Sequence, residues 1–199
     1  MLVDDHSVVR ARYQRLLAGN PRLKVVGELA AGPEPPLMDP DVIVLDISLP
    51  GLSGIEVLKR IVARRPAARV LMFSTHQDAI YVSRAFDAGA HGYLTKGEPP
   101  QLLVQAIETV ADGKRYLSPD VEKALSRQPA KTLEVASSLS SREHEILRLL
   151  TQGYDLAEIG QRLGISAKTV ANHQSSIKQK LGAGSALQLI LIAREMGLK

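Results

Sequence analysis

Five short apolar runs, separated by longer mixed stretches, constrain the fold of the first 118 residues more than any other feature. The runs lie at residues 2–3, 24–29, 42–45, 70–73 and 92–94. Most of the stretches between them carry apolar residues three and four positions apart, which is typical of helices. Continuously apolar strands that alternate with helices form parallel sheets covered on both faces. The pattern predicts a doubly wound α/β domain with a five-stranded parallel sheet, whose ligand site lies at the carboxyl ends of the strands.

The C-terminal part of the chain has a different pattern. From residue 139 on, strand-like runs disappear and helical spacing continues, which predicts a second, smaller all-α domain at 139–199. The first domain is expected at 1–118, and residues 119–138, with Pro119 and Pro129, are expected to form a short helix and a linker. Residues 1–118 hold 14 Lys and Arg against 13 Asp and Glu, whereas 139–199 hold 8 against 5. A basic second domain suits a polyanionic partner.

Composition excludes several classes of protein. The chain has no Cys, so it has neither a disulfide framework nor a thiolate metal site nor a Cys nucleophile. No apolar run approaches the roughly 18 residues that cross a bilayer, and the N-terminus lacks the pattern of a signal peptide. The expected location is the cytoplasm, without membrane contact.

Three acids stand where predicted strands end. Asp4 and Asp5 follow the first strand, and Asp46 follows the third. Because the carboxyl ends of parallel strands meet at one edge of the sheet, these carboxylates are expected to converge and to raise one another's pKa. A hard divalent cation relieves the repulsion, and Mg²⁺ accepts carboxylate, carbonyl and water oxygens.

Two further strand ends carry complementary groups. Ser74 follows the fourth strand and Lys96 follows the fifth. A hydroxyl and a fixed ammonium beside a metal-bound carboxylate indicate phosphoryl transfer with Asp46 as the acceptor. A lone Asp after a strand more often only ends the strand or caps a helix. Because all five residues at these strand ends have side chains that suit phosphoryl transfer, the sequence favours a phosphoryl-transfer site over this alternative.

The segments LVDDH, IVLDISLPGLSGIE, VLMFSTH and GAHGYLTKG resemble the receiver domains of two-component response regulators, in particular the NarL/FixJ family. The resemblance implies a flavodoxin-like fold in which a sensor histidine kinase phosphorylates Asp46. It also implies that Mg²⁺ is held by Asp4, Asp5, Asp46 and the main-chain carbonyl of Ser48. A finer likeness to GacA/UvrY-type regulators runs through YLTKGEPPQLLVQAIETVADGKRYLSP.

The same resemblance gives roles to three more residues. Ser74 and Lys96 are expected to contact the phosphoryl oxygens. Tyr93 occupies the aromatic position that turns inward when the hydroxyl residue follows the phosphate, although a half-buried packing role is the simpler alternative.

Three features depart from the family pattern. The chain begins only three residues before the acidic pair, so the first strand is expected to be short. Four prolines between residues 31 and 40 predict a loop or a single turn in place of the second helix. Gly97 follows Lys96, where many receivers carry Pro. The first two features keep open the alternative of a degenerate receiver on a phosphorylation-independent DNA-binding protein.

The C-terminal segment predicts a helix-turn-helix. Ser140 and Glu143 predict the start of a helix through Leu150. Asp155 caps a second helix, a turn follows at residues 164–166, and Ser166 caps a third helix to about Leu181.

The third predicted helix has two distinct faces. At about 100° per residue, Val170, Gln174, Ile177 and Leu181 share a stripe that is expected to face the core. The opposite face is small and polar, which suits the major groove of DNA, and it gathers Lys168, Ala171, Asn172, Ser175, Ser176 and Gln179. Lys168, Lys178 and Lys180 are expected to neutralise phosphates. An ordinary solvated face is the alternative.

The stretch LSSREHEILRLLTQGYDLAEIGQRLGISAKTVANHQSSIKQKLGA resembles the LuxR-type helix-turn-helix. By that resemblance Lys168 and Thr169 contact the DNA backbone, while Ala171, Asn172 and Ser175 lie at base-reading positions. The last helix, expected at 184–196, pairs subunits in the family, and it carries Leu187, Ile190 and Leu191. Packing on its own domain explains these apolar residues equally well.

The leading hypothesis is therefore a transcription regulator that phosphorylation of Asp46 switches, with a homodimer binding promoter DNA. A phosphatase similar to the haloacid dehalogenase group is an alternative, because those enzymes also use a nucleophilic Asp on an α/β sheet. They need a second acid two residues after the nucleophile, and Ser48 stands there. The sequence therefore favours a regulator over an enzyme.

Overall fold

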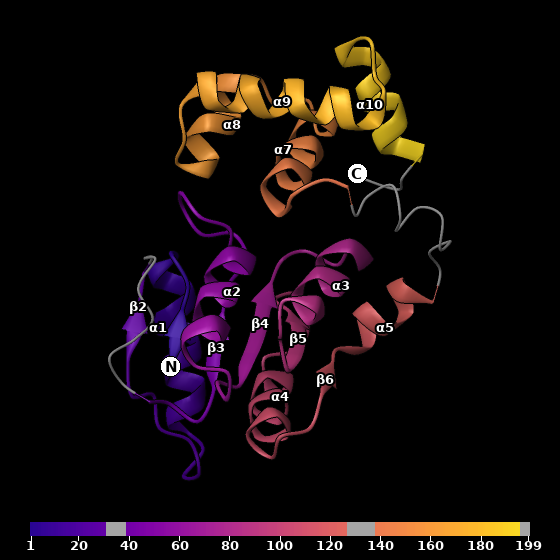
Figure 1. The fold of residues 1–199 in the computed structure, drawn as a ribbon. Coiled ribbons are helices and arrows are strands. Elements are labelled where there is room, and N and C mark those ends of the chain that lie inside the picture. Colours follow the sequence, from indigo (N-terminus) through magenta and orange to yellow (C-terminus); the bar gives the residue numbers. More distant parts are fainter. Residues whose placement is uncertain (31–38, 127–137, 196–199) are drawn as a thin grey trace. The chain divides into compact units, whose positions relative to one another are not determined.

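The computed structural model describes residues 1–30, 39–126 and 138–195 of the chain. Contacts between Cα atoms divide the chain into two compact units, residues 1–127 and 128–199 (Figure 1). The helix expected within 119–138 is α5 (Pro119–Leu125), which packs on α3 and β5 of the first unit.

A parallel sheet forms the centre of the first unit, in the order β2-β1-β3-β4-β5-β6. Its strands are β1 (Leu2–Val3), β2 (Glu28–Leu29), β3 (Ile43–Leu45), β4 (Val70–Ser74), β5 (Gly92–Thr95) and β6 (Tyr116–Leu117). The doubly wound parallel architecture is confirmed, and the short first strand is as expected. The strand order reverses beside β1, which places a switch point between β1 and β3.

The number of strands was predicted wrongly, since the sheet has six strands rather than five. The additional strand, β6, has two residues and follows Arg115, so no apolar run marks it. Backbone bonds to the neighbouring strand create it: the amide of Tyr116 donates to the carbonyl of His91, and the amide of Ser118 donates to that of Tyr93.

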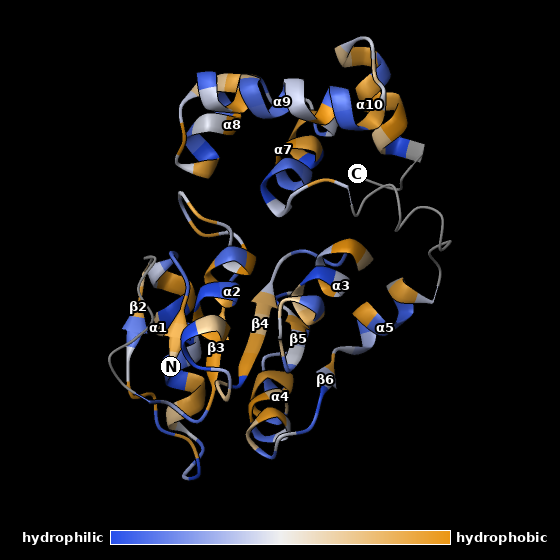
Figure 2. Ribbon diagram, in the orientation of Figure 1, coloured by the Kyte–Doolittle hydropathy of each residue, from blue (hydrophilic) through white to orange (hydrophobic). Residues whose placement is uncertain are grey.

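Helices cover both faces of the sheet. They are α1 (Ser7–Ala18), α2 (Gly54–Arg64), α3 (Ala79–Asp87) and α4 (Gln101–Ala111). Tyr13 of α1 and Leu103 of α4 share one buried cluster with Val44 and Leu71 of the strands. Alternate strand residues such as Leu45 and Met72 are also buried and point to the other face. Figure 2 shows the central strands β3 and β4 in hydrophobic colours.

The loop or turn expected at residues 31–40 lies mostly outside the described residues, since 31–38 are not described. Residues 39–42, which lead into β3, are not helical.

The second unit is helical throughout its described part. It contains α7 (Ser141–Thr151), α8 (Leu156–Leu163), α9 (Ala167–Leu181) and α10 (Ala186–Glu195). The three predicted caps are confirmed: Ser140 and Asp155 form capping boxes with Glu143 and Glu158, and the Ser166 side chain accepts from the Thr169 amide. Gly164 ends α8 with a φ of 64°, which favours glycine.

The core of the second unit follows the predicted helical phase. Val170 and Ile177 of α9 are fully buried, and Gln174 and Leu181 are half-buried. On α8, the guanidinium carbon of Arg162 lies 4.0 Å from the centre of the Tyr154 ring, a cation–π contact.

Among the described residues, no helix combines the length and apolar content that a membrane span requires.

Candidate functional site

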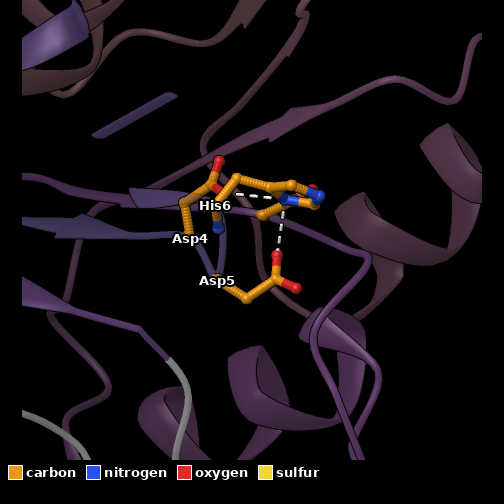
Figure 3. Close-up of side chains that lie close together, drawn as sticks. Asp4, Asp5 and His6 are labelled. Atoms are coloured by element: carbon orange, nitrogen blue, oxygen red, sulfur yellow. Dashed lines mark hydrogen bonds and ion pairs between the residues drawn. The ribbon is translucent and has the colours of Figure 1, made fainter. Parts of the chain in front are cut away.

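Three carboxylates meet at the carboxyl ends of β1 and β3. Asp4 and Asp46 are buried, with 5% and 2% of their surfaces exposed, and Asp5 is half-buried. One oxygen from each acid and a ring nitrogen of His6 all lie within 4.8 Å of one another. Figure 3 shows Asp4, Asp5 and His6 in this cluster. The strand order thus brings together the three acids that the sequence suggested as metal ligands, and their oxygen-rich set fits a hard divalent cation.

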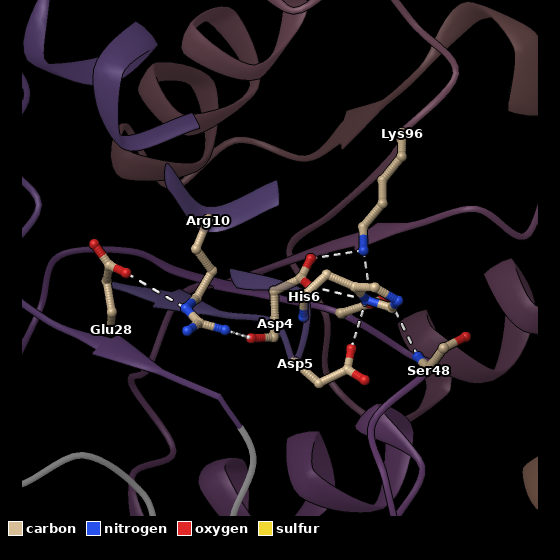
Figure 4. Close-up of polar contacts among 8 residues, drawn as sticks. Asp4, Asp5, His6, Arg10, Glu28, Ser48 and Lys96 are labelled. Atoms are coloured by element: carbon tan, nitrogen blue, oxygen red, sulfur yellow. Dashed lines mark hydrogen bonds and ion pairs between the residues drawn. The ribbon is translucent and has the colours of Figure 1, made fainter. Parts of the chain in front are cut away.

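Lys96, which follows β5, reaches across to the same acids (Figure 4). Its Nζ lies 2.6 Å from Oδ2 of Asp4 and 2.6 Å from Oδ2 of Asp46. Burial raises the pKa of Asp46, and the neighbouring Lys96 offsets only part of that rise. Burial also opposes the charge of Lys96, but the attraction of Asp46 and Asp4 outweighs it and raises the pKa of Lys96. The lysine is therefore a fixed positive charge between two acids.

The loop after β3 is held close to Asp46. The amide of Ser48 donates to Asp46 Oδ1 at 3.2 Å, and the amide of Gly54 donates to the carbonyl of Ile47 at 2.7 Å. The backbone at residues 46–48 is therefore folded around the carboxylate. The role of the Ser48 carbonyl as a metal ligand stays a prediction.

Ser74 and Tyr93 both bond to His76, a residue that the sequence interpretation missed. Ser74 is fully buried, and its Oγ accepts from the His76 amide at 3.2 Å. Tyr93 is also fully buried rather than half-buried, and its hydroxyl donates to the His76 carbonyl at 2.9 Å. The His76 ring lies 3.0 Å from Ser48 Oγ, and it stacks on Tyr81 with 4.3 Å between ring centres. His76 thus links the loop after Asp46 to the loop after Ser74.

Two residues of the first turns after β1 complete the surroundings of the acids (Figure 4). His6 Nδ1 lies 2.7 Å from Asp5 Oδ1, and the His6 amide donates to Asp4 Oδ1 at 2.8 Å. Arg10 donates to the main-chain carbonyl of Asp4 and forms an ion pair with Glu28 at 3.4 Å. The sequence interpretation did not include His6 or Arg10, although both stand within two turns of the acidic pair.

A second polar cluster joins β5 to α5. Thr95, the neighbour of Lys96, donates through its hydroxyl to Asp120. Ser118 Oγ donates to the other Asp120 oxygen at 2.6 Å, and the Asp120 amide donates to Glu98 at 3.1 Å. The start of α5 is therefore bonded to the end of β5, directly before Lys96.

In the second unit, α9 exposes a polar surface without acids. Lys168, Asn172, Ser175 and Gln179 are exposed, while Thr169 and Ala171 are half-buried. Two of the predicted contacts, Ser176 and Lys180, bond within the domain, because both donate to Glu143 of α7. Helix α10 exposes Leu187 and Leu191 at 69% and 52% and half-buries Ile190, whereas Leu189 and Ala193 are fully buried.

A parallel α/β domain with a lysine-bridged acid cluster, joined to a helix-turn-helix domain, defines a receiver-type DNA-binding regulator. The first part matches the family described as "Response regulator receiver domain" over residues 1–108, and the second matches "Bacterial regulatory proteins, luxR family" over residues 137–193. The chain belongs to the NarL/FixJ family of two-component response regulators.

Proteins of similar sequence are also named response regulators. Response regulator UvrY of Escherichia coli is 35% identical, and the alignment covers 100% of this chain and 94% of the relative. Response regulator GacA of Pseudomonas aeruginosa is 33% identical, with 100% of this chain and 96% of the relative covered. These relatives are regulators rather than enzymes of the dehalogenase group, so the phosphatase alternative is set aside.

Solved structures agree. Response regulator ChrA of a heme-sensing two-component system is 35% identical with a TM-score of 0.56, covering 100% of this chain and 97% of that one. RcsB of Salmonella enterica serovar Typhimurium, bound to promoter rprA with a phosphomimetic, is 25% identical with a TM-score of 0.63, covering 95% of this chain and 94% of that one.

Proposed function

We propose that a sensor histidine kinase phosphorylates this regulator on Asp46, and that phosphorylation controls its dimerisation and its binding to promoter DNA in the cytoplasm. The bridge from Lys96 to both Asp4 and Asp46 carries the proposal. A buried acid beside a fixed cation is arranged to accept a dianionic group, because the lysine then compensates the added charge.

The proposed transfer starts from a phosphohistidine of the kinase. An oxygen of Asp46 bonds to phosphorus, the phosphorus–nitrogen bond breaks, and the imidazole leaves with the electron pair of that bond. Asp4, Asp5, Asp46 and the main-chain carbonyl of Ser48 would hold Mg²⁺, which supplies neutralising charge to the phosphoryl oxygens. Lys96 binds one of these oxygens, and the hydroxyl of Ser74 binds another.

The proposed switch runs through the loop after β4. Ser74 and Tyr93 are both bonded to His76. Once the Ser74 hydroxyl turns to the phosphoryl group, its bond to the His76 amide is lost, and this loop is free to take a second arrangement.

The proposed DNA contacts lie on α9. Lys168 and Thr169 contact the backbone, and Ala171, Asn172, Ser175 and Gln179 face base edges. The exposed Leu187 and Leu191 of α10, with Ile190 beside them, pair two copies on a two-fold site. The related RcsB has been solved as two dimers bound to two parallel DNAs, which supports this arrangement.

Labelling with acetyl phosphate tests the acceptor. With Mg²⁺ the wild-type chain is expected to incorporate close to one phosphate per chain, as resolved by intact-mass spectrometry, and Asp46→Asn none. Asp39→Asn is the matched control, because the Asp39 side chain is 95% exposed and outside the cluster. Labelling that survives in Asp46→Asn would exclude Asp46 as the acceptor.

DNA binding with and without the phosphodonor separates the proposed switch from the degenerate-receiver alternative. The proposal expects tighter binding after phosphorylation of the wild-type chain and no change for Asp46→Asn. Equal affinity of the labelled and unlabelled wild-type chain would favour the degenerate receiver.

A further inference from the structure

The buried carboxylate of Glu143 connects two helices of the second unit. Its side chain is 5% exposed and belongs to the first turn of α7. Oε2 accepts from the Ser140 amide at 2.6 Å and from Lys180 Nζ at 2.6 Å. Oε1 accepts from Ser176 Oγ at 2.7 Å. Both carboxylate oxygens therefore accept a bond from α9, and Oε2 also accepts the bond of the capping box.

The two donors on α9 share a face of that helix. Ser176 and Lys180 are four residues apart, so they lie one above the other along α9. This face is turned to α7, with which α9 makes one of the larger sets of contacts in the unit. Two bonds one turn apart restrain the rotation of α9 about its own axis as well as its distance from α7.

The charge on Lys180 is already compensated. Burial opposes ionisation of Glu143, but the bonds from Lys180, Ser140 and Ser176 outweigh it and lower the pKa of Glu143 to about 2. The carboxylate is thus ionised at neutral pH, and the ammonium of Lys180 stands against it. Lys168 differs, because its side chain is exposed at the start of α9 and no ion pair involves it among the described residues.

We propose that Ser176 and Lys180 are positioning residues that hold α9 on the carboxylate of Glu143, and that they set the angle at which this helix meets DNA instead of contacting DNA themselves. The inference rests on the proposed DNA binding, and it changes the role that the sequence suggested for these two residues.

The salt dependence of binding tests the assignment of Lys180. The probes are two fluorescent duplexes of equal length: the sequence that the full wild-type chain enriches from a random library, and its scrambled version. Removing a phosphate contact lowers the slope of log K against log [salt] by about 0.9. Lys168→Met is expected to show that loss, and Lys180→Met is expected to keep the wild-type slope. A loss of slope in Lys180→Met equal to that in Lys168→Met would overturn the proposal.

Sequence discrimination, the ratio of the two affinities, supplies the second readout, and a purely electrostatic role would leave this ratio unchanged. Glu143→Gln removes a negative charge and frees Lys180, so electrostatics alone predicts tighter binding of both duplexes. The positioning role predicts that the ratio of the two affinities falls about tenfold, the size of a lost bond to a charged group. Lys180→Arg, which keeps the cation, is expected to retain the wild-type ratio.

Each variant is first compared with the wild-type chain by circular dichroism, and Ser176→Ala provides a milder change if Glu143→Gln unfolds. An unchanged affinity ratio in a folded Glu143→Gln or Ser176→Ala variant would refute the positioning role. Failure of the wild-type chain to enrich any duplex would instead count against the proposed function itself.

Discussion

A Cβ atom on Gly54 would lie 1.8 Å from the main-chain carbonyl oxygen of Asp46. No side chain fits there, because the nearest atoms all belong to the backbone at Asp46 and Ile47. The start of α2 therefore approaches the acidic residue as closely as two backbones permit, which only glycine allows.

Replacing this glycine is expected to disturb the acid cluster. In Gly54→Ala the backbone after Asp46 must move, which should destabilise the first domain by about 1–3 kcal/mol and slow labelling by acetyl phosphate. Gly97→Ala is the matched control, since the nearest atom to its new Cβ lies at 3.9 Å. Urea unfolding and labelling rates measure both effects. Wild-type behaviour of Gly54→Ala would show that the close approach is not required.

Without Lys96, the stability of the first domain is expected to depend more strongly on a bound divalent cation. Without the ammonium, Asp4 and Asp46 repel each other, so Lys96→Met should melt earlier in EDTA and gain more from Mg²⁺ than the wild type does. Phosphate incorporation should fall by about tenfold or more, because one charge-assisted bond to the phosphoryl group is lost. Thermal unfolding with and without Mg²⁺ tests the first expectation, and an equal Mg²⁺ effect in both proteins would contradict it.

Glu143 makes the stability of the second domain depend on pH in a defined direction. Its pKa is about 2 in the folded chain against 4.5 ordinarily, so the unfolded chain binds the proton more readily. The stabilisation is complete above about pH 4.5 and is lost as the pH falls towards 2. Wild type should therefore exceed Glu143→Gln in unfolding free energy by about 1.5–3 kcal/mol at pH 7, and the two should converge on acidification. If the difference in unfolding free energy between the two proteins stayed constant down to pH 2.5, the stabilising role of the ionised Glu143 would be refuted.

The exposed leucines of α10 are expected to affect association and not folding. Leu187→Ser and Leu191→Ser should weaken dimers of the phosphorylated chain, as measured by sedimentation, with little change in melting temperature because both side chains are exposed. The neighbouring Leu189→Ala is the contrasting control, since Leu189 is fully buried and its truncation should cost about 2–5 kcal/mol. Dimers that persist in the double variant would place the interface elsewhere.

Local sequence signals predicted the parts of the structure that are themselves local. The apolar runs before Asp4, Asp46 and Lys96 mark strands, and parallel strands place their ends together, so the acid cluster followed from the pattern. Ser140 and Ser166 were recognisable as caps because a cap and its partner lie within one turn.

The features that the sequence did not reveal depend on contacts between distant segments. The ring of His76 meets Ser48 across 28 positions, and Lys180 meets Glu143 across 37. The helical periodicity of α9 places Lys180 outside the core stripe, which is why the sequence predicted a contact between Lys180 and a DNA phosphate. Only the packing of α7 against α9 shows that a carboxylate lies beside it.

The contact between Arg162 and Tyr154 has a practical consequence for spectroscopy. The chain has no tryptophan and five tyrosines, of which Tyr154 alone belongs to the second unit. Its ring lies beneath a guanidinium on α8, the helix that precedes the helix-turn-helix turn. A fluorescent tyrosine analogue at this single position would report on the DNA-binding domain without interference from tryptophan, so each half of the molecule can be followed separately as the other binds its ligand.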